Sequence, residues 1–257
     1  MSIEISVLDI ALFILVFCRM AGMILFNPLL ASQNVPARLK SGFVLGLTFL
    51  IAPTLNWDGL PLDTGTALVF AMFRELFIGF VCGMVFQFFY YILFFVGDVM
   101  DVGFGLSMAK VFDPATNIQT STASRLLQIV FVLYLFATNS HLVLIRIFAS
   151  SYMIIPVGAQ SLNLEIGRFM LELFVSIFSL AIRLALPFMA AEFTLEISMG
   201  VLMKLIPQIN AFVINLQFQV LLGLVLLFLF CGPIANFVDS YLGQMLQSIE
   251  RALYAMG

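Results

Sequence analysis

Residues 67–97 read ALVFAMFRELFIGFVCGMVFQFFYYILFFVG, and only Arg74 and Glu75 in this run are charged. As a helix with a rise of 1.5 Å per residue, the run would be about 46 Å long, whereas the hydrocarbon core of a bilayer is about 30 Å thick. A run this long and this apolar cannot lie at the surface of a water-soluble domain. It predicts a helix that is covered by lipid or by other apolar protein.

The whole chain continues this pattern. Of its 257 residues, 63% are hydrophobic and 10% are charged, whereas an ordinary soluble domain has roughly 25% charged residues. The mean hydropathy is +1.14. The net charge of -3 comes without the basic stripe that nucleic acid attracts. We therefore expect a membrane protein rather than a soluble enzyme, and no nucleic-acid partner.

The remaining apolar runs predict an all-α membrane protein of six to eight helices in a single unit, residues 1–257. A helix over 41–55 would be only about 22 Å long, so the runs do not fit a simple series of spans, and this favours helices packed on protein. The other runs are 10–30, 126–155, 169–190 and 210–235, with a weaker amphipathic stretch at 192–206.

The C-terminal stretch 237–254 has a helical period of apolar residues. We expect its apolar face to lie on a membrane surface or on a partner. That face consists of Val238, Leu242, Met245, Ile249 and Leu253.

Several residues are expected to begin, break or turn helices. The run 126–155 has Thr138-Asn139-Ser140-His141 at its middle, so it is either one long helix or a tight helical hairpin, and we favour the hairpin. Proline suits a first helical turn but removes a backbone donor elsewhere, where it produces a kink or a turn. The expected positions are Pro36 at a helix start, Pro187, and Pro207 with Gln208 and Asn210.

Ionisable residues inside the apolar runs are candidate contact residues. A charge at bilayer depth costs at least about 2.5 to 3.5 kcal/mol, so each must face protein, water or an opposite charge. Ion pairs inside the helix bundle are the favoured explanation, and an ion pathway or polar contacts between subunits are the alternatives. The candidates are Arg19, Arg74, Glu75, Arg146, Glu172, Arg183, Glu192 and Lys204.

No pattern of catalytic or metal-binding residues is visible. His141 is the single histidine, and Cys18, Cys82 and Cys231 lie far apart in apolar sequence, where cysteine usually acts as a small buried hydrophobe. No nucleophile elbow, Walker A loop or dinucleotide fingerprint occurs. We therefore expect no enzymatic activity, no cofactor and no metal.

Two glycine pairs and one polar segment complete the pattern. Gly42 with Gly46 and Gly79 with Gly83 have the small-xxx-small spacing that lets helix backbones approach closely. The segment 97–124 is the most polar long stretch, so it forms either an aqueous loop or the lining of a channel. The residues alone favour the loop.

A series of motifs then resembles the FliR family of flagellar biosynthetic proteins over nearly the whole chain. Asn139 stands where that family usually has an acidic residue, which puts a charge role at that turn in doubt. The motifs are Asn34-Val35-Pro36-Ala37-Arg38 with Gly42, Ala52-Pro53, Arg74-Glu75 with Gly79, Gly103 to Met108 with Asp113-Pro114, Asn139-Ser140-His141-Leu142, Ile155-Pro156-Val157-Gly158 and Pro207-Gln208-Ile209-Asn210.

The resemblance implies a structural subunit of the flagellar type III export gate, in the bacterial inner membrane at the flagellar basal body. Members of the family form tilted helical hairpins in a hetero-oligomeric channel with P-type and Q-type subunits, and a B-type export-switch subunit binds the same gate. Unfolded flagellar proteins would be the cargo. Residues 1–160 would be a P-type-like half that includes the polar segment 98–125, and 161–257 a Q-type-like half with an amphipathic end at 237–256.

By the same analogy, residues 106–122 would project into the channel and help to close it, which reverses the preference for a simple loop. The plug residues would include Met108, Lys110, Val111, Phe112, Asp113, Pro114, Asn117 and Gln119.

Two alternatives stay open. One is the counterpart of this subunit in virulence injectisomes. The other is a proton-coupled small-molecule secondary transporter, with Asp98, Asp101 or Glu172 as proton carrier and helix breaks at Pro187 and Pro207. The sequence shows no paired breaks in two corresponding halves, which disfavours the transporter.

Overall fold

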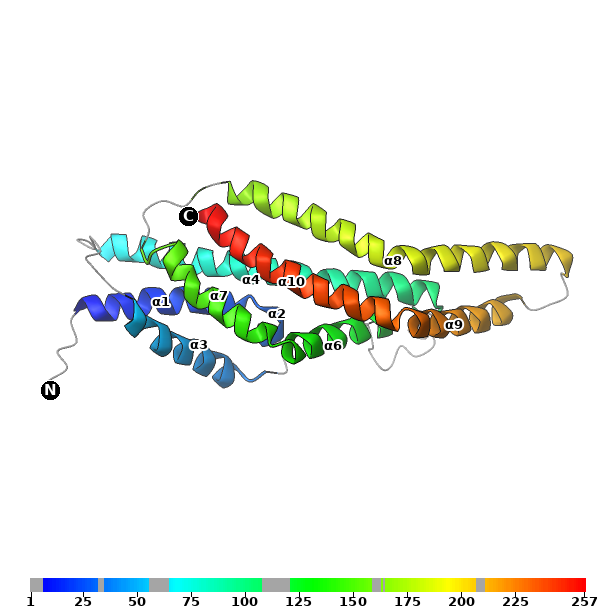
Figure 1. Ribbon diagram of the computed structural model, residues 1–257, viewed down its shortest axis with the longest axis horizontal. Helices are drawn as coiled ribbons and strands as arrows, with labels where there is room; N and C mark the ends of the chain where they lie inside the picture. Colours follow the sequence, from blue (N-terminus) through cyan, green and yellow to red (C-terminus); the bar gives the residue numbers. More distant parts are fainter. Residues whose placement is uncertain are drawn as a thin grey trace. The chain divides into compact units, whose positions relative to one another are not determined.

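The computed structural model describes residues 7–31, 35–55, 65–107, 121–158, 163, 165–206 and 211–257, and these ranges contain helices and no strands (Figure 1). The all-α prediction is therefore confirmed for this part of the chain. In chain order the helices are α1 (Val7–Leu25), α2 (Pro28–Ala31), α3 (Ala37–Ile51), the 3-10 turn η1 (Ala52–Thr54), α4 (Gly65–Gly103), α6 (Thr122–Ala137), α7 (Ser140–Ile154), α8 (Ile166–Leu205), α9 (Ala211–Leu229) and α10 (Cys231–Met256).

The longest helices are α4, with 39 residues, and α8, with 40. Each is long and apolar enough to cross a membrane, and the bent pairs α6 with α7 and α9 with α10 would add two more spans if each pair counts as one. This range of two to four spans confirms the membrane-protein class. Helix α3 has 15 residues and is about 22 Å long, too short to cross a bilayer by itself.

Helix α8 joins two stretches that the sequence presents separately, 169–190 and 192–206. Pro187 lies inside it, so the hairpin turn that the sequence allowed there does not form. A proline in a helix removes one backbone hydrogen bond, the one that its own N–H would donate four residues back. The apolar turns on both sides stay helical, and the helix continues to Leu205.

The run 126–155 is interrupted at the predicted position, but the two helices on either side are bent by 73° rather than folded back on each other, so the tight hairpin is wrong. Helix α6 ends at Ala137 and α7 begins at Ser140. Between them Asn139 has φ 57° and ψ 19°, a left-handed conformation that asparagine tolerates better than most residues. Pro36 directly precedes α3 as its N-cap, whereas Pro207, Gln208 and Asn210 lie outside the described residues.

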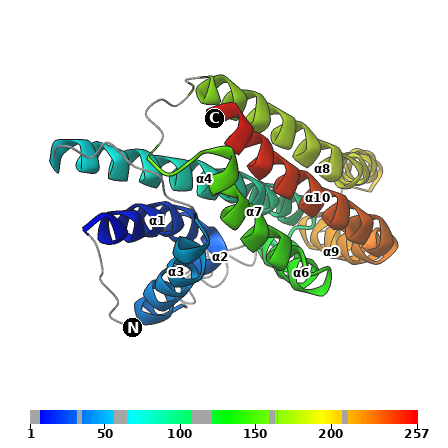
Figure 2. The same ribbon diagram turned by 60° about the vertical axis from the view of Figure 1, so that its left-hand side comes forward.

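The chain forms two compact units that alternate along the sequence. Unit 1 consists of Met1–Phe89, Asn139–Leu173 and Gly243–Gly257, and unit 2 of Tyr90–Thr138 and Phe174–Leu242. Helices α4, α8 and α10 therefore contribute residues to both units. In unit 1, α3 packs beside α1, as both views show (Figures 1 and 2).

Aromatic side chains form much of the core of unit 2. Phe104, just after α4, lies 6.0 Å from Phe188 of α8, whose ring is 5.2 Å from Phe230 (centroid distances). Phe131 of α6 contacts Tyr90 and Tyr241 in the same way, with centroids 6.1 and 6.4 Å apart. These contacts bind the end of α4 and the second half of α6 to the rest of unit 2.

The apolar face predicted for 237–254 exists, but it is covered by the chain itself. Val238, Leu242, Met245, Ile249 and Leu253 are each at most 1% exposed, whereas Asp239, Gln247 and Arg251 are exposed. The expectation that this face lies on a membrane surface or on a partner is wrong, because helical periodicity identifies an apolar face without identifying what covers it.

The three cysteines are free thiols in different surroundings. Cys82 is buried, as expected, and Cys18 is half-buried. Cys231 is exposed, so the interpretation of all three as buried hydrophobes fails there. Its position at the first residue of α10 explains the exposure.

Candidate functional site

The residues expected to form the plug lie between the segments that contain α4 and α6. Met108, Lys110, Val111, Phe112, Asp113, Pro114, Asn117 and Gln119 all fall within 108–120, outside the described residues. The candidate site therefore consists of the described residues on either side of 108–120. These are the end of α4 with the following turn, and the start of α6. All of this frame belongs to unit 2.

Glycines fit the end of α4 tightly against α8 and α9. A Cβ at Gly103 would collide with the carboxylate of Glu192 in α8, and one at Gly105 would meet the side-chain oxygen of Gln219 in α9 at 2.8 Å. Gly105 also has φ +68°, a conformation that suits glycine. Phe104, 3% exposed, lies against Gly223 of α9. The contacts of Gly103, Phe104 and Gly105 with α8 and α9 thus fix the position of the chain just before residue 108.

The start of α6 is fixed by a carboxylate from α4. Asp101, 1% exposed, accepts hydrogen bonds from the backbone N–H groups of Thr122 at 2.6 Å and Ala123 at 2.9 Å. The first N–H groups of a helix have no partner within the helix, and a negative charge there is further favoured by the helix dipole. Asp101 therefore caps α6 from another helix.

Two serines complete this contact. Ser121, the N-cap of α6, accepts a hydrogen bond from the N–H of Ser124 and donates one to the carbonyl of Gly97. Ser124 donates to the carbonyl of Phe94 at 2.7 Å, and the backbone of Gly97 lies directly against Ser124. We call Gly97, Asp101, Ser121 and Ser124 the α4–α6 clasp. It joins residues on both sides of 108–120.

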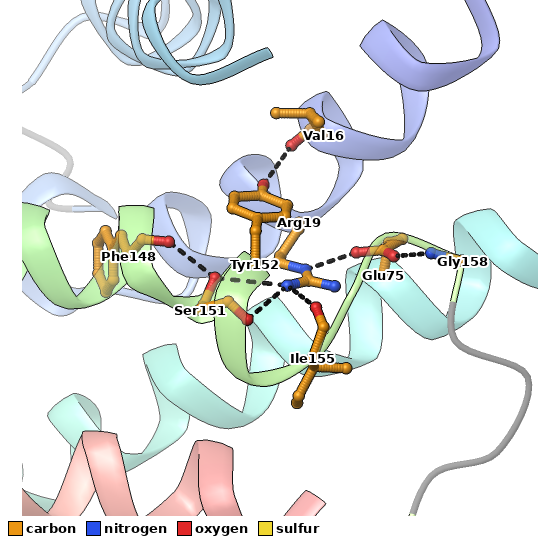
Figure 3. Close-up of polar contacts among 8 residues, drawn as sticks. All are labelled: Val16, Arg19, Glu75, Phe148, Ser151, Tyr152, Ile155 and Gly158. Carbon is orange, nitrogen blue, oxygen red and sulfur yellow. Dashed lines mark hydrogen bonds and ion pairs between the residues drawn. The ribbon is translucent and has the colours of Figure 1, made fainter. Parts of the chain in front are cut away.

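A second polar group, the Arg19 cluster, lies in the core of unit 1 (Figure 3). Arg19 of α1 is 0% exposed, and its Nε donates to Oε2 of Glu75 in α4 at 2.5 Å. Its Nη1 donates to the carbonyls of Ser151 at 3.1 Å and Ile155 at 2.9 Å. An ion pair at this depth is tolerated because further hydrogen bonds satisfy the buried groups.

The other members of the cluster hold this ion pair in place. The Arg19 guanidinium carbon lies 4.2 Å from the ring centre of Tyr152, whose hydroxyl donates to the carbonyl of Val16. The second carboxylate oxygen of Glu75 accepts from the N–H of Gly158 at 2.8 Å. Of the three guanidinium nitrogens, only Nη2 has no hydrogen-bond partner among the described residues. The cluster joins α1, α4, α7 and the turn after α7.

Glycines bring α1 and α4 close enough for this ion pair. A Cβ at Gly79 would meet Gly22 Cα and Met23 N of α1 at 2.8 Å, and one at Gly83 would meet Phe26 Cβ at 2.6 Å. This pair of glycines is therefore a packing site, as the spacing predicted. No atom lies within 4 Å of the Cβ positions of Gly42 and Gly46, so that pair packs against no described part of the chain.

The remaining candidate contact residues are not gathered into one site. Arg74 is half-buried, and Glu192 is partly buried against Gly103. Glu172 forms an exposed ion pair with Arg168 one turn away, with side chains 65% and 85% exposed. Such a pair contributes little stability because water already solvates both charges. Arg146, Arg183 and Lys204 are exposed.

The sequence indicated only part of these two polar groups. It identified Arg19 and Glu75 as buried charges but did not single out Ser151 or Tyr152. It gave Gly158 only as part of a family motif and did not predict its contact with Glu75. It considered Asp101 as a proton carrier and missed its capping role. The signal that could have revealed that role is Ser121 directly before the apolar run of α6, a pattern typical of a helix N-terminus.

The described residues contain no group of three or more His, Cys, Asp or Glu side chains that could hold a metal ion. The polar side chains of both clusters are engaged in contacts between helices. The geometry is that of a scaffold with fixed helix junctions.

Comparisons with known proteins show which family the chain is similar to. The chain matches the model of a family described as bacterial export proteins, family 1, over residues 10–245. It is 28% identical to the flagellar biosynthetic protein FliR of Escherichia coli (strain K12) over 227 residues, which cover 88% of this chain and 87% of that protein.

Two further relatives are similar over most of their length. FliR of Bacillus subtilis (strain 168) is 24% identical over 257 residues, 98% of each chain. The surface presentation of antigens protein SpaR of Shigella flexneri is 26% identical over 235 residues, 89% of each chain. Because the family match extends from the first turn of α1 into α10, the chain belongs to the bacterial export proteins, family 1.

Proposed function

We propose that the chain is a structural, non-enzymatic subunit of the flagellar type III protein export gate, located in the bacterial inner membrane at the flagellar basal body. The observation that carries the proposal is the family match over residues 10–245, together with relatives named flagellar biosynthetic protein FliR that align over nearly their full length. Two to four candidate membrane spans support the location.

The proposal includes partners. The chain assembles with P-type and Q-type subunits into a channel for unfolded flagellar proteins, and a B-type export-switch subunit binds the assembly. Residues 1–160 act as the P-type-like half and 161–257 as the Q-type-like half. Support comes from α8, which buries only 33% of its apolar window against the rest of the chain and so leaves a large apolar surface for neighbours.

Residues 106–122 close the channel in this proposal. The support is indirect: the α4–α6 clasp joins residues on both sides of 108–120, so a segment held there would have fixed ends. A segment that blocks a channel needs such a base, because otherwise the passing cargo would displace it as a whole.

Deleting residues 110–120 tests the closing role. The deletion leaves Asp101 and Ser121 in place, so we expect normal assembly and increased leakage of ions through the membrane of cells that carry the variant. A deletion of residues 57–63, in the acidic link before α4, is the control and should not change leakage. An unchanged leak after the first deletion would remove the plug role.

An export assay tests the broader proposal. Cells that lack the chain should fail to export flagellar proteins, and the restored chain should recover export. The similarity to SpaR favours the virulence counterpart as the second candidate, so the chain should also be tested in cells that lack their injectisome subunit. Recovery of injectisome secretion alone would favour that candidate.

A further inference from the structure

A charged side chain is exposed near the middle of α8, one of the two single helices that are long and apolar enough to cross a membrane. Arg183 lies on α8 with 17 helical residues before it and 22 after it, which places it about 26 Å from one end of the helix and about 33 Å from the other. Its neighbours on the same face, Ser179 and Leu186, are exposed as well. No hydrogen bond or ion pair joins the Arg183 guanidinium to the described residues.

The backbone carbonyl of the same residue lacks its usual helical donor. In a helix, the N–H of residue 187 would donate to the carbonyl of Arg183, but Pro187 has no N–H. One turn of α8 therefore offers a guanidinium with five donors and a carbonyl without its helical donor. Both need polar partners, and hydrocarbon supplies neither.

Lipid is a poor environment for this turn. An arginine at bilayer depth is costly unless its side chain reaches the headgroups or meets an opposite charge. With helix ends about 26 and 33 Å away, Arg183 lies within the hydrocarbon layer of about 30 Å when that layer is centred on the middle of α8. The surface around Arg183 is therefore one that protein should cover.

We infer that this face of α8 docks a helix from another subunit of the export gate, and that this helix places an Asp or Glu carboxylate against Arg183. The inference rests on the proposed function. Charge complementarity selects the occupant, because arginine and carboxylate form short, paired hydrogen bonds that are strengthened away from water. Ser176 and Ser179, both exposed, are small enough to let a second helix approach closely.

The serine hydroxyl on this face does not replace the missing partner. Ser179 donates to the carbonyl of Val175 on its own helix at 2.9 Å, so it can lie at a helix interface without a partner of its own. The specific requirement of the face is thus one negative charge at the level of Arg183. This distinguishes Arg183 from Glu172, whose exposed charge already has Arg168 beside it.

Zero-length crosslinking tests the inference in the intact complex. The variant Arg183→Lys keeps the charge and provides an amine, and the chain is purified in mild detergent after co-expression with P-type and Q-type subunits. A carbodiimide should then join the new amine at position 183 to an Asp or Glu of one of those subunits. The control is Leu171→Lys, 70% exposed on α8 and about 120° around the helix, which should give at least about tenfold less of this product.

Assembly provides the second measurement. Recovery of the complex should fall about tenfold or more with Arg183→Glu, remain near wild type with Arg183→Lys, and be restored for Arg183→Glu when the crosslinked carboxylate is replaced by arginine. Normal assembly of Arg183→Glu, a crosslink to a second copy of this chain, or no protein crosslink from the Arg183→Lys variant would each overturn the inference. Failure of the wild-type chain to form any complex would instead refute the proposed function.

Discussion

Buried charge in the described part of the chain is confined to three side chains, Arg19, Glu75 and Asp101. Arg19 and Glu75 bind each other, and Asp101 binds the first amides of α6. Each of them joins segments that are far apart in the sequence. These three residues hold the chain together, whereas exposed charges such as Arg183 are available to partners.

Removing Glu75 should be strongly destabilising. Glu75→Ala leaves the Arg19 guanidinium buried without its counter-charge, and we expect the free energy of unfolding in detergent to fall by about 3–5 kcal/mol. Glu172→Ala, which breaks an exposed pair on α8, should change it by about 0.5 kcal/mol or less. Chemical denaturation measures both, and equal stabilities of the two variants would contradict the structural role of the Arg19 cluster.

Replacing both charges separates the cost of burial from the loss of packing. In Arg19→Met with Glu75→Met, no unpaired charge remains and the side chains stay large, so this double variant should be more stable than Glu75→Ala in the same denaturation experiment. If the double variant is less stable than Glu75→Ala, the hydrogen bonds to Ser151, Ile155 and Gly158 contribute more than the ion pair.

At this scale the sequence predicted the burial of Arg19 and Glu75 but not the residues that they meet. Ion pairing inside the bundle was the wrong expectation for the exposed candidates, which are Arg146, Glu172, Arg183 and Lys204. Arg19 and Glu75 are separated by 56 positions, and no local pattern pairs them. The hydrogen-bond partners of Arg19 in α7 and the turn after it are mainly backbone carbonyls. Every residue has a carbonyl, so residue type cannot indicate which ones the guanidinium contacts.

Helices with the same glycine spacing behave differently in this chain. Gly79 and Gly83 of α4 lie directly against α1, whereas Gly42 and Gly46 of α3 have open space where a side chain would be. The motif permits close packing without requiring it. Periodicity likewise predicted the apolar face of α10 but not the burial of that face within the chain.

A matched pair of alanine variants tests the crossing of α1 and α4. In Gly79→Ala the new methyl group would meet backbone atoms of α1 at 2.8 Å, so the helices must separate and the Arg19–Glu75 contact must lengthen. We expect a loss of about 1–3 kcal/mol in the free energy of unfolding. Gly46→Ala should be neutral or stabilising by up to about 1 kcal/mol, because alanine favours helix more than glycine does. The reverse order of stabilities would refute this packing.

The α4–α6 clasp should control the start of α6. Asp101→Asn removes the negative charge that binds the N–H groups of Thr122 and Ala123. Hydrogen–deuterium exchange should therefore accelerate at these two amides, with a stability loss of about 1–2 kcal/mol. Asp239→Asn, an exposed position on α10, is the control. Unchanged exchange at residues 122 and 123 would show that Asp101 does not cap the helix in solution.

The whole molecule consists of two compact units, and each of the helices α4, α8 and α10 contributes residues to both. Sequence runs predicted the helices and the membrane class, because apolar length is a local property. They could not predict the alternation of the units, since that depends on contacts between residues far apart in the chain. The sequence runs also predicted two separate stretches, 169–190 and 192–206, where the structure has the single helix α8. A polar turn and Pro187 resemble a helix boundary in the sequence.

Native mass spectrometry tests the central claim most directly. The tagged chain is co-expressed with the neighbouring P-type and Q-type subunits, extracted in mild detergent and weighed intact. An export-gate subunit should appear in one defined hetero-complex that contains both partners. Recovery of the chain only as a stable monomer or homodimer would contradict the account and favour an autonomous transporter.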